Sequence, residues 1–166
     1  MVSVLDVVLP RPATNEYRGG RVPLVGFCAL FATQIFSSTV HLLKDDSGVN
    51  SIASIIVFPF EGPADPNNII YLFSAVGGVT QMMFTVLYGL VLWRYRSLLP
   101  LMLCFMLLEA LLGLIVTALH PLTPEYFEYT PPALVARLPK LIVLPLLVGM
   151  AIHTSRKASR SGSPTG

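Results

Sequence analysis

The chain has 166 residues, of which 54% are hydrophobic and 12% are charged, and its mean hydropathy is +0.70. Because roughly a quarter of the residues in water-soluble domains are charged, this composition excludes an ordinary soluble domain and predicts a surface that faces lipid. The net charge of +2 is small and the basic residues form no continuous stripe, which excludes a nucleic-acid-binding protein.

Residues 1–21 alternate short apolar and charged stretches. They lack the compact apolar region and the small-residue cleavage site of a signal peptide. We therefore expect a retained cytoplasmic N-terminal segment.

Four apolar runs, each long enough to cross a bilayer, occupy most of the remaining chain. About 20 residues of helix, at roughly 1.5 Å per residue, cross the hydrocarbon core. Helices are expected because a spanning segment must satisfy its backbone hydrogen bonds internally. Pro139 and Pro145 interrupt the fourth run and predict kinks. The prediction is an all-α integral membrane four-helix bundle over residues 22–153, with helices at 22–43, 69–93, 98–119 and 132–152.

The connections between these helices differ in length and composition. Residues 44–68 contain an apolar stretch, Val49–Phe58, that is too short to span, so this connection is either a short interfacial or re-entrant helix or a loop resting on the bundle. The link Arg94–Ser97 is so short that the second and third helices must form an antiparallel hairpin. Residues 120–131 contain three prolines and predict an irregular loop. The Ser-, Arg- and Gly-rich residues 154–166 predict a disordered cytoplasmic tail.

The positions of Lys and Arg predict the orientation, because these residues concentrate in cytoplasmic segments. With the N-terminus inside, the outer loops hold Lys44 alone. The inner segments then hold Arg11, Arg18, Arg21, Arg94, Arg96, Arg156, Lys157 and Arg160. Both termini are therefore expected in the cytoplasm, with the protein in a bacterial inner membrane or a plasma membrane.

Polar residues recur on one face of each of the first two predicted helices. Those of the first helix are spaced i, i+3, i+4 and i+7: Gln34, Ser37, Ser38 and His41. Those of the second helix are Ser74, Gly78, Gln81, Thr85 and Tyr88. Both stripes are expected to face the bundle interior, because polar groups at membrane depth are costly against lipid. The spacing of Ser74 and Gly78 also predicts a close contact between helices.

Glu109 lies near the middle of the third predicted helix, where an acidic residue costs about 2.5–3.5 kcal/mol without a partner or a proton. Lys140 of the fourth helix can reach it, while Arg137 is a further ion-pair candidate or extends to the surface. We predict an intramembrane polar cluster of Gln34, Ser38, His41, Gln81, Glu109 and Lys140. Such a cluster either binds or transforms a ligand, or only joins the helices through hydrogen bonds.

No motif identifies a cofactor or a reaction. His41, His120 and His153 stand at separate helix ends, so no metal or haem site is predicted. Cys28 and Cys104 form no CxxC pair, and we interpret them as buried small hydrophobic residues.

The order of four helices, the long first outer loop, and Gly77-Gly78 followed by Tyr88-Gly89-Leu90 and a short basic turn resemble the DoxX-like group of small four-helix membrane proteins. The resemblance covers about the central two thirds of the chain and implies a four-helix membrane fold. The chain departs from the group in two features: the first helix lacks an Arg-Gly start, and the acidic residue is Glu109 of the third helix and not a residue of the second.

Three classes of function are compatible with these residues. The first is a non-enzymatic accessory subunit of a larger membrane complex, favoured because no complete catalytic constellation is present. The second is a binder or carrier of a lipid, a quinone or another hydrophobic small molecule. The third is a small intramembrane enzyme in which Glu109 or His41 acts as acid or base. The predicted partners are membrane lipid, other membrane subunits or an apolar ligand.

Overall fold

The computed structural model describes residues 3–161, and the regular structure in this part of the chain is helical. Its helices are α1 (Val4–Val8), α2 (Arg21–Leu43), α3 (Asn67–Arg94), η1 (Arg96–Leu98), α4 (Leu99–Leu119), η2 (Pro124–Tyr126), α5 (Pro132–Val135) and α6 (Arg137–Ser161).

Four of these helices, α2, α3, α4 and α6, are long and apolar enough to cross a membrane. Only 17% to 28% of the residues in each apolar window are buried inside the protein, so most of the apolar surface of these helices points outward. Lipid is the environment in which such a surface is stable. The chain is therefore a small, all-α, multi-pass membrane protein.

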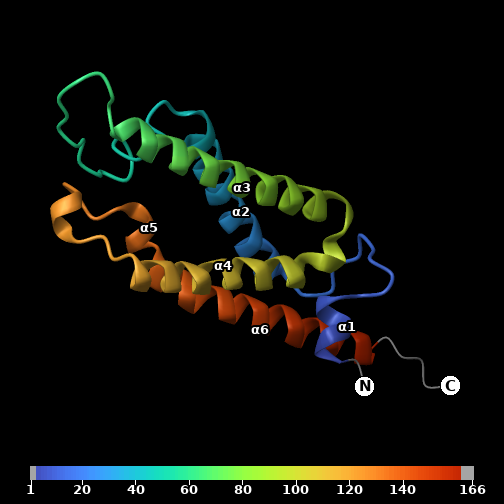
Figure 1. Cartoon of the computed structure of the whole chain (residues 1–166). Helices are drawn as coiled ribbons and strands as arrows, with labels where there is room; N and C mark the ends of the chain where they lie inside the picture. The colour runs from blue at the N-terminus through green and yellow to red at the C-terminus, as the bar shows by residue number, and fades with distance from the viewer. Residues whose placement is uncertain (1–2, 162–166) are drawn as a thin grey trace.

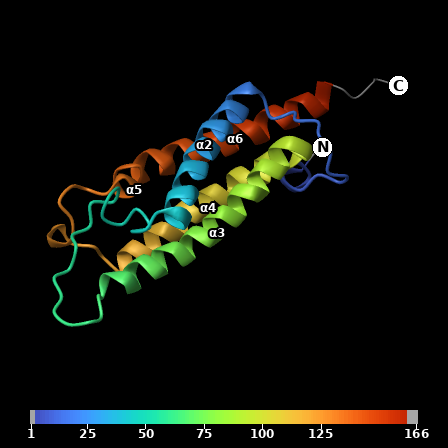
Figure 2. The same cartoon turned by 90° about the horizontal axis from the view of Figure 1, so that it is seen from above.

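The four helices pack as two pairs. Helix α2 packs most extensively against α3, and α4 packs most extensively against α6, while fewer contacts join the two pairs. Helix α1 and the last turns of α6 lie at one end of the bundle, next to the η1 link (Figure 1). The connections 44–66 and 120–131 lie together at the opposite end (Figure 2). We call these the link end and the loop end.

The hydrophobic core lies in the half of the bundle nearest the link end. All four spanning helices contribute side chains to it: Phe27, Tyr88, Val91, Leu99, Met102, Leu103, Met106, Leu144, Leu147 and Ala151. Phe27 and Tyr88 pack edge to face, with their ring centroids 5.9 Å apart. The two helix pairs are thus joined at the link end.

Gly78 brings α2 and α3 into close contact. A Cβ atom at this position would lie 2.8 Å from the backbone carbonyl carbon of His41, which is too close for any other residue type without movement. A Cβ atom at Gly77 would meet nothing within 4 Å. The predicted close contact is therefore confirmed for Gly78, whereas Gly77 lies outside the helix contact.

The connection 44–66 is a series of turns, so the interpretation as a short interfacial or re-entrant helix was wrong and the loop interpretation holds. Ser47 and Ser54 have positive φ angles of 52° and 57°, which end any helical run. The carboxylate of Asp46 accepts hydrogen bonds from the backbone N–H groups of Gly48 (2.9 Å) and Ser51 (2.7 Å). Polar side chains here satisfy the backbone groups that a helix would have paired.

The fourth predicted helix differs from the structure at both of its ends. It is divided at Ala136 into α5 and α6, because Pro139 has no N–H group to donate to the carbonyl oxygen of Val135. At its other end α6 continues to Ser161, so the expected disorder from Thr154 onward was wrong as far as that residue. Contacts with α1 support these last turns, and residues 162–166 lie outside the described part.

The two long connections hold each other at the loop end. Ile55 and Phe127 form an isolated antiparallel bridge. On either side of it, the Ile56 N–H donates to the carbonyl oxygen of Tyr126 (3.0 Å) and the Glu128 N–H donates to that of Ser54 (2.9 Å). We call this joined pair of loops the loop cover, because it closes the end of the bundle where the helix pairs are not joined by the core.

Candidate functional site

A cavity of about 580 Å³ lies beneath the loop cover, between the two helix pairs. We call it the loop-end cavity. Its apolar wall includes Leu30, Phe36, Val40 and Val143. Its polar side chains are Thr33, Gln34, Ser37, His41, Gln81, Glu109 and Lys140. A smaller cavity of about 200 Å³ shares Gln34, Glu109 and Lys140 with it and also reaches Arg137.

Helix geometry explains why residues so far apart in the sequence meet here. Gln34, Ser37 and His41 follow one face of α2 at i, i+3 and i+7. Glu109 lies at the middle of α4, and Lys140 lies in the first turn of α6. The helix pairs separate toward the loop end, so these side chains surround an open space and do not pack into a core.

Five of the six residues predicted to cluster line this cavity, and Ser38 does not. Ser38 is fully buried between α2 and α3, where its hydroxyl accepts a hydrogen bond from the Thr85 hydroxyl at 3.1 Å and donates to the Ile35 carbonyl at 3.2 Å. Ser38 lies outside the cavity because it is about 100° of helix turn away from Ser37 and faces the neighbouring helix. The hydrogen bond from Thr85 joins α3 to α2, whereas the bond to Ile35 lies within α2.

Gln34 places a buried polar atom in the wall of the cavity. Its side-chain Nε2 is buried and has no hydrogen-bond partner among residues 3–161. Its neighbour in the cavity, Gln81, has its Oε1 occupied by the Ser37 hydroxyl at 3.1 Å. A buried donor without an acceptor costs about 1–3 kcal/mol, so the cavity holds a hydrogen-bonding capacity that the protein itself does not use.

Glu109 and Lys140 attract each other electrostatically across the cavity. In the described part of the chain they form no direct ion pair, and neither does Glu109 with Arg137. Both Glu109 and Lys140 are exposed residues. The cavity thus presents one acidic and one basic group with room between them.

His41 connects the cavity wall to the loop cover. Its Nδ1 lies 2.8 Å from the carbonyl oxygen of Ser47 and 3.2 Å from the hydroxyl oxygen of Ser74. Because a carbonyl oxygen only accepts hydrogen bonds, Nδ1 carries the proton that it donates to Ser47. In the neutral ring Nε2 is then the acceptor. His41 therefore holds the turn at Ser47 in place.

Three loop residues that sequence analysis missed, Gly48, Ile52 and Ala53, also line the cavity. Nothing in their local pattern marks them, since they reach the cavity only through the turns of residues 44–53. Within residues 3–161, no three His, Cys, Asp or Glu side chains come close enough to hold a metal ion. The groups present suit hydrogen bonding and charge complementarity toward an amphipathic molecule.

No family model, no curated protein and no solved structure matches the chain. The resemblance to the DoxX-like group therefore stays a prediction.

Proposed function

We propose that the protein binds a hydrophobic small molecule that carries hydrogen-bond acceptors, such as a lipid or a quinone, in the loop-end cavity. The observation that carries this proposal is the buried, unpartnered Nε2 of Gln34 in the wall of a 580 Å³ cavity. An acceptor oxygen of a ligand would satisfy this donor.

The size and lining of the cavity support a ligand of this class. Small-molecule sites in proteins measure roughly 300–1,000 Å³ and combine apolar walls with a few polar groups that fix the orientation. The loop-end cavity falls in this range. Here Gln34 would bind an oxygen of the ligand, while Glu109 and Lys140 would face its polar end. Leu30 and Val40 would contact its apolar body.

The edge of the cavity is apolar and exposed, which favours a ligand that arrives from the bilayer. Phe36 is 62% exposed and Val143 is 42% exposed, on the two helix pairs that flank the space. In a membrane these side chains would contact lipid. A hydrophobic molecule dissolved in the bilayer could then enter without crossing water.

The other two classes of function stay as predictions. The lack of a catalytic constellation in the sequence favours an accessory subunit. An intramembrane enzyme with Glu109 as acid or base would use the same cavity. Binding is the function that the cavity supports most directly.

Replacing Gln34 by Leu tests the proposal. The change keeps the side-chain volume and removes the unpartnered donor, so we expect an unchanged or higher free energy of unfolding. The retained ligand should fall by about five- to tenfold, as expected for one lost hydrogen bond of about 1–1.5 kcal/mol. The measurement is mass spectrometry of the small molecules that accompany the full chain after extraction from the membrane without detergent.

Ser38→Ala is the matched control, because Ser38 lies on the same helix but faces α3. It should lower the free energy of unfolding by roughly 0.5–1.5 kcal/mol through the lost interhelical hydrogen bond with Thr85, and leave the ligand content unchanged. Glu109→Gln, which removes the charge and keeps the shape, should reduce ligand content with little loss of stability. If the wild-type chain carries no small molecule, or if all three variants carry the same amount, ligand binding is contradicted; stoichiometric protein partners would instead support the accessory subunit.

A further inference from the structure

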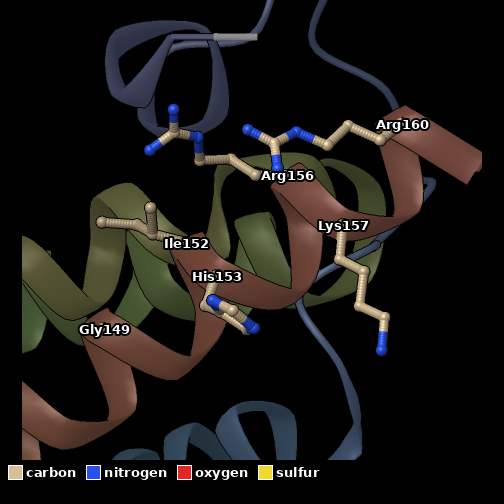
Figure 3. Close-up of a pocket in the computed structure, with 6 residues that line it drawn as sticks. All are labelled: Gly149, Ile152, His153, Arg156, Lys157 and Arg160. Atoms are coloured by element: carbon tan, nitrogen blue, oxygen red, sulfur yellow. The ribbon is translucent and has the colours of Figure 1, made fainter. Parts of the chain in front are cut away.

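A second cavity, of about 550 Å³, lies on the surface of α6 (Figure 3). It lies toward the link end and shares no residue with the loop-end cavity. It follows about three turns of one helix and is lined by Gly149, Ile152, His153, Arg156, Lys157 and Arg160. We call it the basic groove. Its residues change from apolar to basic along the helix, in the direction that leads out of the membrane.

Arg156 and Arg160 form the charged part of the groove. They are four residues apart, so they share one face of α6, and their side chains project to the same side while Lys157 points elsewhere (Figure 3). Within residues 3–161, neither arginine forms an ion pair with a carboxylate. Two guanidinium groups on one face without acidic partners favour an anionic ligand, and the planar guanidinium matches phosphate oxygens in geometry.

Gly149 and Ile152 form the apolar part. A Cβ atom at Gly149 would meet nothing within 4 Å, so the missing side chain leaves open space beside the helix. Ile152 is half-buried and closes the apolar stretch of α6 before the first basic residues. This open space beside Gly149 favours contact with an alkyl chain.

The spacing along α6 matches the layers of a membrane. At about 1.5 Å per residue, Arg156 lies roughly 6 Å beyond Ile152 along the helix axis, and Arg160 roughly 12 Å beyond it. The polar headgroup layer adds roughly 5–7 Å to each side of the hydrocarbon core. If Ile152 marks the edge of the hydrocarbon, Arg156 lies at the level of the lipid phosphates and Arg160 just outside them.

We propose that the basic groove binds one anionic phospholipid. Arg156 and Arg160 would hold its phosphate, and an acyl chain would lie against Gly149 and Ile152. This site is independent of the ligand proposed for the loop-end cavity, which lies at the opposite end of the bundle. Each basic residue at the membrane surface strengthens the attraction to anionic lipid by roughly fivefold.

Native mass spectrometry of the full chain, delipidated in detergent and then given equal amounts of phosphatidylglycerol and phosphatidylcholine, tests the proposal. The wild-type chain should retain phosphatidylglycerol in clear preference. Arg156→Gln with Arg160→Gln should weaken phosphatidylglycerol retention by at least about tenfold, since two charges are lost. Gly149→Leu, whose Cβ atom meets no protein atom within 4 Å, should occupy the apolar part of the groove, weaken retention of both lipids and leave the fold intact.

Two control variants make the result specific. Arg94→Gln with Arg96→Gln removes the same charge at the same end of the bundle but outside the groove, and should change lipid retention by less than about twofold. Gly77→Leu adds the same side chain at another open position and should have no effect. Equal losses in both arginine pairs, or no lipid preference in the wild-type chain, would overturn the proposal. So would complete competition by soluble glycerol phosphate, because it would identify a site for free phosphate compounds.

Discussion

Polar side chains of the bundle differ in whether other groups of the protein form hydrogen bonds with them. Ser37 and Ser38 both donate or accept hydrogen bonds across helices, whereas the buried nitrogen of Gln34 has no partner among the described residues. All three stand on the stripe predicted from helical spacing. Spacing distinguishes inside from outside, but it does not distinguish a paired group from an unpaired one, because that depends on the neighbouring helix.

At the loop end, the pKa of the Asp46 carboxyl group also depends on the neighbouring groups. Partial burial raises the pKa of its carboxyl, but the hydrogen bonds from Ser51 and Gly48 and the nearby Lys44 charge outweigh this effect and bring the pKa down to about 2. The ionised carboxylate therefore stabilises the turn that covers the loop-end cavity. A carboxyl group whose pKa is lower in the folded protein than in the unfolded chain stabilises the fold when the pH is above the unfolded pKa. This stabilisation is lost as the pH falls toward the pKa of the folded protein.

We therefore predict that the loop cover is stable above about pH 5 and loosens between about pH 4 and 2, as Asp46 becomes protonated. Asp46→Asn should loosen the same segment at neutral pH by about 1 kcal/mol, discounted for the partial exposure of the side chain. Hydrogen exchange of residues 44–55 in detergent micelles measures both effects. Asp45→Asn is the control, because Asp45 accepts no hydrogen bond from this turn; equal exchange rates in the two variants would contradict the assignment to Asp46.

At the scale of elements, the tight pairing of α2 and α3 contrasts with the open space between the two helix pairs. Gly78 permits the close approach of α3 to the backbone of His41, and the Ser38–Thr85 hydrogen bond lies along the same contact. The division of the fourth predicted helix into α5 and α6 has the opposite effect. Ala136 and Pro139, at and just after the break, both line the loop-end cavity. Small residues close one helix contact, and a proline helps to keep another part of the bundle open.

Gly78→Ala should lower the free energy of unfolding by about 1–3 kcal/mol, because the added methyl group meets the backbone of α2. Gly77→Ala adds the same group on the same helix into open space, and should be neutral or stabilising by up to about 1 kcal/mol through helix propensity. Reversible unfolding in mixed detergent micelles measures both changes. Equal effects of the two variants would show that α2 and α3 do not depend on this contact.

At the scale of the whole molecule, four spanning helices place α1 and the end of α6 at the same end of the bundle. The link end carries Arg94, Arg96, Arg156 and Arg160, and the loop cover carries Lys44. We propose that the link end faces the cytoplasm, because positively charged residues are retained on that side. The loop-end cavity then opens in the half of the bilayer away from the cytoplasm.

This orientation predicts the location of fused reporters. An enzyme that is active only after export should be active when inserted after Gly62, in an exposed part of the loop cover, and inactive when fused after Gly166. A reporter that is active only in the cytoplasm should give the reverse pattern at the same two positions. Export of the Gly166 fusion would reverse the proposed orientation and would leave the four-helix fold unchanged.

The sequence by itself determined the all-α fold and the four spanning helices, because hydropathy over some 20 residues and the need to pair every backbone group in lipid are properties of each segment alone. It also determined which helix faces are polar, because helical spacing is local. Gln34, Gln81 and Glu109 were recognised in this way.

Only the tertiary structure decided how those faces meet. The separation of the helix pairs toward the loop end, the place of Ser38 against α3 and the turns that bring Gly48 to the cavity depend on contacts between segments far apart in the chain. Residues 44–53 have an apolar content that suits either a short helix or a turn. The turn is selected by the hydrogen bond that the Asp46 carboxylate accepts from Gly48 and by the one that the Asn50 amide donates to Ile55. The physical reason is that hydropathy governs where a segment lies, whereas packing and hydrogen-bond partners govern what it encloses.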